Sequence, residues 1–324
     1  MTATISADDW IGHIRREYLA SFIKDGGSSI KFAVTQDAAS QDSLSHDLCA
    51  SAARDGYLVA RVSAQDTRIH MMDQLFFRIA EQVPWRELSR AVVNKLAVEG
   101  DFAPAVDGSE SLIDRLASAN RMEPTSIKQL LRPKVETRVA KNRKLARDFR
   151  VAVSHLCWAE LSGGLDAEMT ATVIIEWLTG RNRAVAAVKP YQIFTRIHRT
   201  NARHLFASLL RWVRFAGHSG LVVVTDMARV SLAANPKDGT IFYSKAAMFD
   251  AYEVLRQFID ATDEMKGLLM VLTPSIEFLD QDSDGRGLGA YEALKFRVFD
   301  EVRDQRLVNP MTSLVRVAAT NGDS

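Results

Sequence analysis

The sequence has little cysteine and no long hydrophobic run, and each absence excludes a class of protein. The two cysteines among 324 residues, Cys49 and Cys157, are too few for a disulfide framework or a cysteine-rich zinc site. We expect both to be buried thiols in a reducing compartment. No apolar stretch approaches the roughly 18 residues of a membrane span, and the N-terminal residues lack the pattern of a signal peptide. These features predict a cytoplasmic protein without a membrane segment.

The sequence also lacks an excess of either charge, with 41 Lys and Arg residues against 40 Asp and Glu residues. This balance excludes a uniformly basic nucleic-acid coat protein. The charges are unevenly placed, because residues 128–214 carry 17 basic and 6 acidic side chains. Residues 1–127 (13 basic, 18 acidic) and 215–324 (11 basic, 16 acidic) each have a net charge of −5. A basic block between acidic blocks indicates a distinct module or a one-sided electrostatic surface.

Short apolar segments separated by helical periods predict a parallel α/β sheet. Residues 85–215, in contrast, show helical periodicity only. The sequence therefore predicts a doubly wound, mostly parallel sheet of about five strands, divided by a large helical insertion into residues 1–84, 85–215 and 216–324. We expect strands at 29–34, 57–62, 220–225, 267–272 and 313–318, and helices at 8–24, 42–54, 70–83 and 246–262.

The first strand-to-helix connection lies where ligands of α/β sheets bind, beyond the carboxyl ends of the strands. A phosphate-binding P-loop at this place needs glycines, a lysine for the phosphates and a Ser or Thr for magnesium. Residues 35–42 read TQDAASQD, so Gln41 and Asp42 stand at the lysine and Ser/Thr positions. The strand at 220–225 is followed by Asp226, as in a magnesium-supporting site, and then by Met227 where a water-activating Glu is common.

Several segments resemble the BREX-system ATP-binding proteins, a BrxD-like family of P-loop ATPases in phage defence. Residues 17–34 (EYLASFIKDGGSSIKFAV) are similar to the entry of their P-loop, and residues 193–226 to their approach to the Walker B strand. The resemblance implies a P-loop NTPase-like fold and work in oligomeric assemblies. The implied partners are an active ATPase paralogue, a second copy of the chain or another defence protein. The downstream helix, sensor strand and following loop of the BREX-system ATP-binding proteins are also similar to this chain, at residues 252–259, 267–278 and 287–298.

Most of the family's nucleotide residues are replaced in this chain. Of the positions that the resemblance implies, Asp226 carries over and Thr273 at the sensor strand is a weaker candidate. Gln41, Asp42 and Met227 depart from the family pattern. A bound polyphosphate would meet acidic side chains and no lysine, and each charge pair at about 4 Å is worth roughly 4 kcal/mol. We therefore predict that binding of ATP and magnesium is lost.

These departures predict a degenerate ATPase that acts as a binding or assembly subunit of an antiphage system. The chain also stops six residues after its last expected strand, so we expect the family's helical lid to be missing. Two alternatives stay open: an active ATPase with an atypical site, and a DNA-binding regulator outside defence.

The basic insertion predicts contacts with a nucleic-acid backbone. Residues 128–150 contain nine Lys and Arg residues and two acids, and residues 138–150 could form one helix with basic side chains on one side. Such contacts neutralise phosphates and position a protein on DNA without reading its sequence. An acidic protein partner, or the chain's own acidic segments, could instead meet this block. The candidate contact residues are Lys134, Arg138, Lys141, Arg143, Lys144 and Arg147.

Aromatic residues interleave with the basic residues of the insertion. Exposed rings could stack on unpaired bases. Helical spacing makes them core residues more often, since Phe206, Leu209, Leu210 and Val213 fit one buried face. We therefore expect most of these rings to lie in the core. They are Trp158, Trp177, Tyr191, Phe194, Phe206, Trp212 and Phe215.

No metal site is expected from the sequence. Asp280, Asp282 and Asp284 begin like a calcium-binding EF-hand loop, but Gly287 and Tyr291 stand at the eighth and twelfth positions, where an apolar residue and a bidentate Glu are needed. We interpret this segment as a solvated turn. The seven histidines show neither the HExxH spacing nor a Cys/His cluster.

Overall fold

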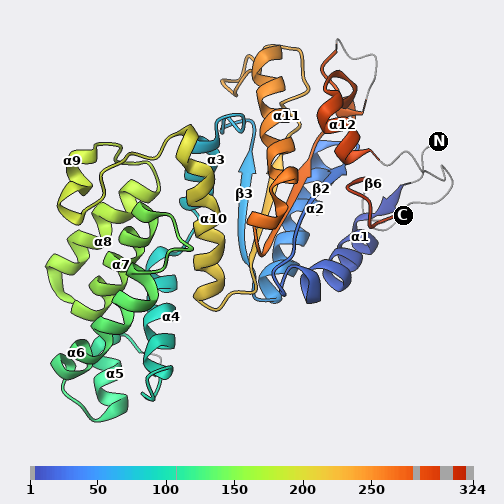
Figure 1. The fold of residues 1–324 in the computed structure, drawn as a ribbon. Coiled ribbons are helices and arrows are strands. Elements are labelled where there is room, and N and C mark those ends of the chain that lie inside the picture. Colours follow the sequence, from blue (N-terminus) through green and yellow to red (C-terminus); the bar gives the residue numbers. More distant parts are fainter. Residues whose placement is uncertain (1–3, 107, 280–284, 300–308, 319–324) are drawn as a thin grey trace. The chain divides into compact units, whose positions relative to one another are not determined.

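The structure is a computed structural model that describes residues 4–106, 108–279, 285–299 and 309–318. The chain divides into two compact units. The sheet unit comprises residues 1–82 and 218–324, and the helical unit comprises residues 83–217 (Figure 1). Among the described residues, the structure has no helix of the length and apolar character that crossing a bilayer requires.

The described part of the sheet unit contains one six-stranded sheet in the order β1-β6-β2-β5-β4-β3, with every pair parallel. This confirms the predicted α/β class and all five expected strands. The additional edge strand has only two residues, too few for an apolar pattern. The strands are β1 (Ile5–Ser6), β2 (Ser28–Val34), β3 (Leu58–Ser63), β4 (Leu221–Asp226), β5 (Leu268–Thr273) and β6 (Leu314–Ala318).

Both faces of the sheet are covered, as the near-continuous apolar runs of β4 and β5 require. On one face, Trp10, Ile14 and Leu48 belong to a buried cluster with alternate residues of the strands. On the other, Phe32 of β2 stacks on Phe278 with 5.6 Å between ring centroids. The helices of this unit are α1 (Ala7–His13), continuing as π-helical η1 (Ile14–Phe22), α2 (Ala38–Arg54), α3 (Met72–Ala80), α11 (Lys245–Asp260) and α12 (Glu292–Val298), with short 3-10 turns η4 (Thr262–Glu264), η5 (Ile276–Phe278) and η6 (Leu288–Ala290).

The helical unit is built around α7, which packs against α4, α5, α6 and α8 (Figure 1). Phe149, Val153 and Leu156 of α7 are buried, and its free thiol Cys157 is buried as expected. The described residues of this unit include no strand, in agreement with the sequence. Its helices are α4 (Trp85–Val98), α5 (Leu112–Asn120), α6 (Pro124–Val135), continuing as π-helical η2 (Glu136–Ala140), α7 (Arg147–Ser162), α8 (Gly164–Leu178), α9 (Val185–Val188), the 3-10 turn η3 (Lys189–Tyr191) and α10 (Arg199–Phe215).

Two sequence-based expectations about helices are wrong. The helix expected from residue 42 begins at Ala38, because Asp37 caps it by accepting a hydrogen bond from the Ser40 N–H. The single helix expected over residues 138–150 is interrupted between η2 and α7. There the side chain of Asn142 accepts a hydrogen bond from the Lys144 N–H, which favours a turn over a helix.

Candidate functional site

The register of the parallel strands brings three polar residues into one row at the carboxyl edge of the sheet. Asp226 at the end of β4 pairs with Ser63 of β3 on one side and with Thr273 of β5 on the other. Ligands of doubly wound sheets bind beyond this edge. A nucleotide with magnesium would therefore bind next to this row of residues.

The carboxylate of Asp226 accepts hydrogen bonds from four donors within its own unit. Its Oδ2 accepts from Ser63 Oγ at 2.7 Å and from Gln65 Nε2 at 3.3 Å. Its Oδ1 accepts from the Ala228 N–H at 2.9 Å and from Gln41 Nε2 at 2.5 Å. Both oxygens are thus occupied by neutral donors, and the negative charge is stabilised without a cation.

Gln41 holds the centre of this network. It lies in the first turn of α2 with its side chain buried, and its amide nitrogen also approaches Thr273 Oγ1 at 3.0 Å and the Thr273 carbonyl at 3.2 Å. An amide has two hydrogens for these acceptors and carries no charge. At the place where a P-loop lysine would reach the phosphates, the chain thus has a neutral link between α2, β4 and β5.

The amino terminus of α2 does not offer an anion site. Only residues 35–37 connect β2 to α2, so the chain has no room for a long loop that turns its N–H groups around a phosphate. Asp37 occupies the cap position, and the bond from Ser40 at 2.7 Å lowers the pKa of its carboxyl group. A fixed negative charge therefore stands where a phosphate would need N–H donors.

The two remaining residues of the expected site point elsewhere or are inert. The exposed carboxylate of Asp42 lies 3.5 Å from Arg61, away from the Asp226 network. Met227 is fully buried, and its N–H donates to the Thr273 carbonyl at 3.1 Å. Its thioether cannot activate a water molecule as a Glu would. Taken together, the residues at this edge do not fit a magnesium–nucleotide complex.

Sequence reasoning missed two participants, Ser63 and Gln65, and it expected Asp37 near a bound polyphosphate without recognising it as the cap of α2. The first two lie just beyond the expected strand at 57–62, and only the pairing register reveals that they face Asp226. The capping role of Asp37 was predictable, because Asp is a preferred residue at the position just before a helix begins.

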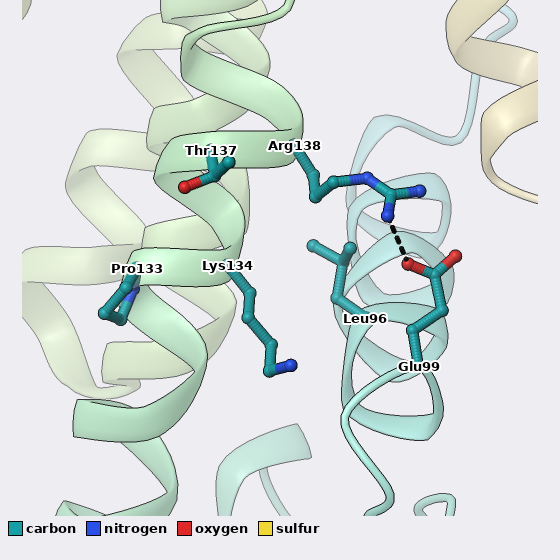
Figure 2. Close-up of a pocket in the computed structure, with 6 residues that line it drawn as sticks. All are labelled: Leu96, Glu99, Pro133, Lys134, Thr137 and Arg138. Carbon is teal, nitrogen blue, oxygen red and sulfur yellow. Dashed lines mark ion pairs between the residues drawn. The ribbon is translucent and has the colours of Figure 1, made fainter.

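Two of the expected nucleic-acid residues line a groove in the helical unit. Figure 2 shows Lys134 and Arg138 extending from α6 and η2 toward the end of α4. Arg138 pairs with Glu99 at 3.1 Å. The stem of Lys134 passes over Gly100, where a Cβ atom would lie only 2.6 Å from Lys134 Cε. The groove has a volume of about 570 Å³ and is lined by Leu96, Glu99, Pro133, Lys134, Thr137 and Arg138.

The other four basic residues do not share one helix face, contrary to the expectation. Lys141 pairs with Glu136 at 2.9 Å, and this hydrogen bond lowers the pKa of the Glu136 carboxyl. Arg147, the first residue of α7, pairs with the neighbouring Asp148 at 2.8 Å. Arg143 and Lys144 lie exposed in the turn between η2 and α7. Acids of the same unit thus neutralise part of the basic block.

Of the seven interleaved aromatic residues, three are buried in the core, three are partly buried and one is exposed. Trp177, Phe206 and Trp212 are buried. Phe194 is the exception, with 48% of its surface exposed. The guanidinium of Arg147 lies over this ring, 5.2 Å from its centroid. Trp158, Tyr191 and Phe215 are partly buried.

Among the residues that the structure describes, no three His, Cys, Asp or Glu side chains gather in a metal-binding arrangement. Asp280, Asp282 and Asp284, which resemble the start of an EF-hand loop, lie outside the described ranges.

Comparisons with known proteins identify the family. A family model described as BREX system ATP-binding protein BrxC/D matches residues 17–323. Searches of curated proteins and of solved structures gave no match. The match covers nearly the whole chain, including both halves of the sheet and the helical unit. The chain therefore belongs to the BREX system ATP-binding protein family and is a subunit of a phage-defence system.

Proposed function

We propose that this chain is a non-hydrolysing member of its family that serves as a binding and assembly subunit of the defence system. The observation that carries the proposal is the occupied carboxylate of Asp226. A magnesium-binding aspartate must offer an oxygen to the ion or to its water shell. Here Gln41 and Ser63 already donate to the two carboxylate oxygens.

The charges near this edge oppose a polyphosphate as well. The Asp37 carboxylate accepts a hydrogen bond from the Ser40 N–H at the start of α2, and Gln41 stands in place of the lysine. At about 4 Å and an effective dielectric constant near 20, one lost attraction or one added repulsion is worth roughly 4 kcal/mol. A single remaining aspartate that contacts magnesium would not offset both changes.

The fold needs no nucleotide to remain intact, which suits a subunit that binds other proteins. Gln41, Asp226 and Thr273 satisfy one another, and β4 and β5 are buried on both faces. Family membership supports other defence-system proteins as partners. We propose an active ATPase paralogue as the first of these, with a second copy of the chain as the alternative.

A phosphate-release assay tests the loss of hydrolysis. We expect the wild type and the Asp226→Ala variant to release phosphate from Mg-ATP at the same background rate. Phosphate release by the wild type that the substitution abolishes would overturn the proposal and favour an active ATPase with an atypical site.

Contact with a DNA backbone is a second proposed activity of the helical unit. It is favoured by Arg143 and Lys144, whose exposed side chains make no hydrogen bond or ion pair among the described residues. Binding of duplex DNA should weaken steeply with salt, because each neutralised phosphate releases counterions. A sequence-specific footprint on the gene's own promoter would instead favour a regulator outside defence.

Fluorescence anisotropy at several salt concentrations tests this contact. We expect the double variant Arg143→Gln/Lys144→Gln to bind duplex DNA more weakly and to lower the salt slope by about two. The matched control is Arg16→Gln/Lys266→Gln, which removes two exposed charges from the sheet unit. Equal effects of the two double variants would show that the turn at 141–146 is no DNA site.

A further inference from the structure

A short segment of the helical unit presents an aromatic ring to solvent although its neighbours are anchored in the core. Ile193 and Ile197 are buried, whereas Phe194 and Arg196 between them are exposed. An exposed Phe loses the hydrophobic stabilisation that burial gives its neighbours. Burial of Ile193 and Ile197 thus anchors the segment while the Phe194 ring stays partly exposed to solvent.

The backbone beside this ring is fixed from two sides. The N–H of Thr195 donates to Asp148 Oδ2 at 3.3 Å, and its hydroxyl donates to the same oxygen. The Thr195 carbonyl accepts a hydrogen bond from Trp177 Nε1 at 3.1 Å. Helices α7 and α8 therefore hold the segment, and the position of Phe194 is set before any ligand arrives.

One arginine contacts the ring and a second follows it in the sequence. Arg147 lies over it at 5.2 Å from the centroid and is oriented by its 2.8 Å contact with Asp148 Oδ1. Arg196 is exposed on the same segment, and residues 181–225 contain no acid. Asp148 itself is buried, with both of its oxygens used as acceptors. An anionic ligand would thus meet little repulsion here.

We infer that Phe194 is a stacking platform for an unpaired base of single-stranded nucleic acid, with Arg147 and Arg196 placed for the flanking phosphates. Aromatic rings and basic side chains together are how proteins hold single strands, because every base has a face that stacks. A duplex keeps its base faces within the stack, so the ring gives preference for a single strand. The inference rests on the proposed DNA contact and names its substrate.

The test compares a short labelled single strand, the same sequence as a duplex, and an abasic single strand of equal length. Binding is measured by anisotropy with the full-length chain. Phe194→Leu, which keeps apolar volume but loses the ring, should weaken single-strand binding about tenfold and leave duplex and abasic binding unchanged. Phe194→Trp should restore binding. Phe296→Leu, at an exposed ring of the sheet unit, is the control and should have no effect.

Each other outcome overturns the inference in a distinguishable way. If Phe194→Leu lowers the affinity for the single strand and the duplex equally, or lowers neither, Phe194 does not stack on a base. The proposed DNA contact would remain in that case. Failure of the wild type to bind any of the three probes at low salt would overturn the DNA contact itself. Unchanged DNA binding by Phe194→Leu, with loss of a co-purifying defence protein, would assign the ring to a protein interface. Equal melting temperatures exclude unfolding as the cause of any loss.

Discussion

At the scale of single residues, neutral donors satisfy the half-buried Asp226 carboxylate where a nucleotide site would use a cation. The Asp226 carboxylate is held by amide, hydroxyl and backbone donors, chiefly Gln41 and Ser63. An acceptor shielded from water that loses a donor is destabilised, because water cannot fully replace the lost hydrogen bond. The polar edge of the sheet is therefore a structural element that contributes stability by itself.

Replacement of Gln41 by Leu should destabilise the sheet unit by about 1–3 kcal/mol, because Asp226 and Thr273 would each lose a donor. Gln36→Leu, at an exposed position in the loop before α2, should change the stability by less than about 0.5 kcal/mol. Urea denaturation of both variants measures the difference. Equal midpoints for the two variants would contradict the structural role of Gln41.

Lys31 of β2 gives a second prediction at this scale. Its ammonium is buried and donates to Tyr18 Oη at 2.5 Å and to the Met311 carbonyl at 2.6 Å, with no carboxylate among its described partners. Burial lowers the pKa of Lys31 to about 8. Between that pH and the ordinary lysine value, the unfolded chain binds more protons than the folded chain, so stability rises with pH.

Relative to a Lys31→Met variant, the wild type should therefore gain about 2 kcal/mol of unfolding free energy between pH 7.5 and pH 10. The comparison with the variant removes the contributions of other groups that titrate in this range. A difference between the two proteins that stays constant over these pH values would show that Lys31 does not lose its proton in the folded chain.

At the scale of elements, close approach of β4 and β5 depends on a glycine. Gly220 immediately precedes β4, and a Cβ atom there would lie 2.4 Å from the Gly267 carbonyl oxygen. Gly220→Ala should lower the unfolding free energy by about 1–3 kcal/mol, because backbone cannot give way as a side chain can. Gly289→Ala, which meets nothing within 4 Å, is the control for thermal denaturation. Equal melting temperatures for Gly220→Ala and Gly289→Ala would contradict the close approach of the Gly220 and Gly267 backbones.

Element types were predictable where apolar periodicity is strong and failed where polar chemistry decides. The strands at β2 to β6 follow from runs such as LVVV and LLMVL. The start of α2 and the break before α7 depend instead on Asp37 and Asn142, whose side chains bond to nearby N–H groups. The spacing of basic residues does not show where a side chain such as that of Asn142 ends a helix. The expectation of one helix over 138–150 was therefore wrong.

At the scale of the whole molecule, the family and the sheet were readable from scattered segments, whereas the arrangement of the site was not. Asp226 and Thr273 were candidates because the family resemblance implies them, and the register of β4 and β5 brings them side by side. The participation of Ser63 depends on the register of β3, which the sequence does not specify to one residue. The pairing of Arg138 with Glu99 depends on helix packing and likewise escaped prediction.

The most direct test of the central claim is calorimetric titration of the full chain with Mg-ATP. The account predicts no saturable binding at micromolar nucleotide, because Gln41 occupies the Asp226 carboxylate and Asp37 occupies the α2 terminus. The Asp226→Ala variant should behave identically. Saturable micromolar binding by the wild type that disappears in Asp226→Ala would contradict the account and would assign Asp226 to a working nucleotide site.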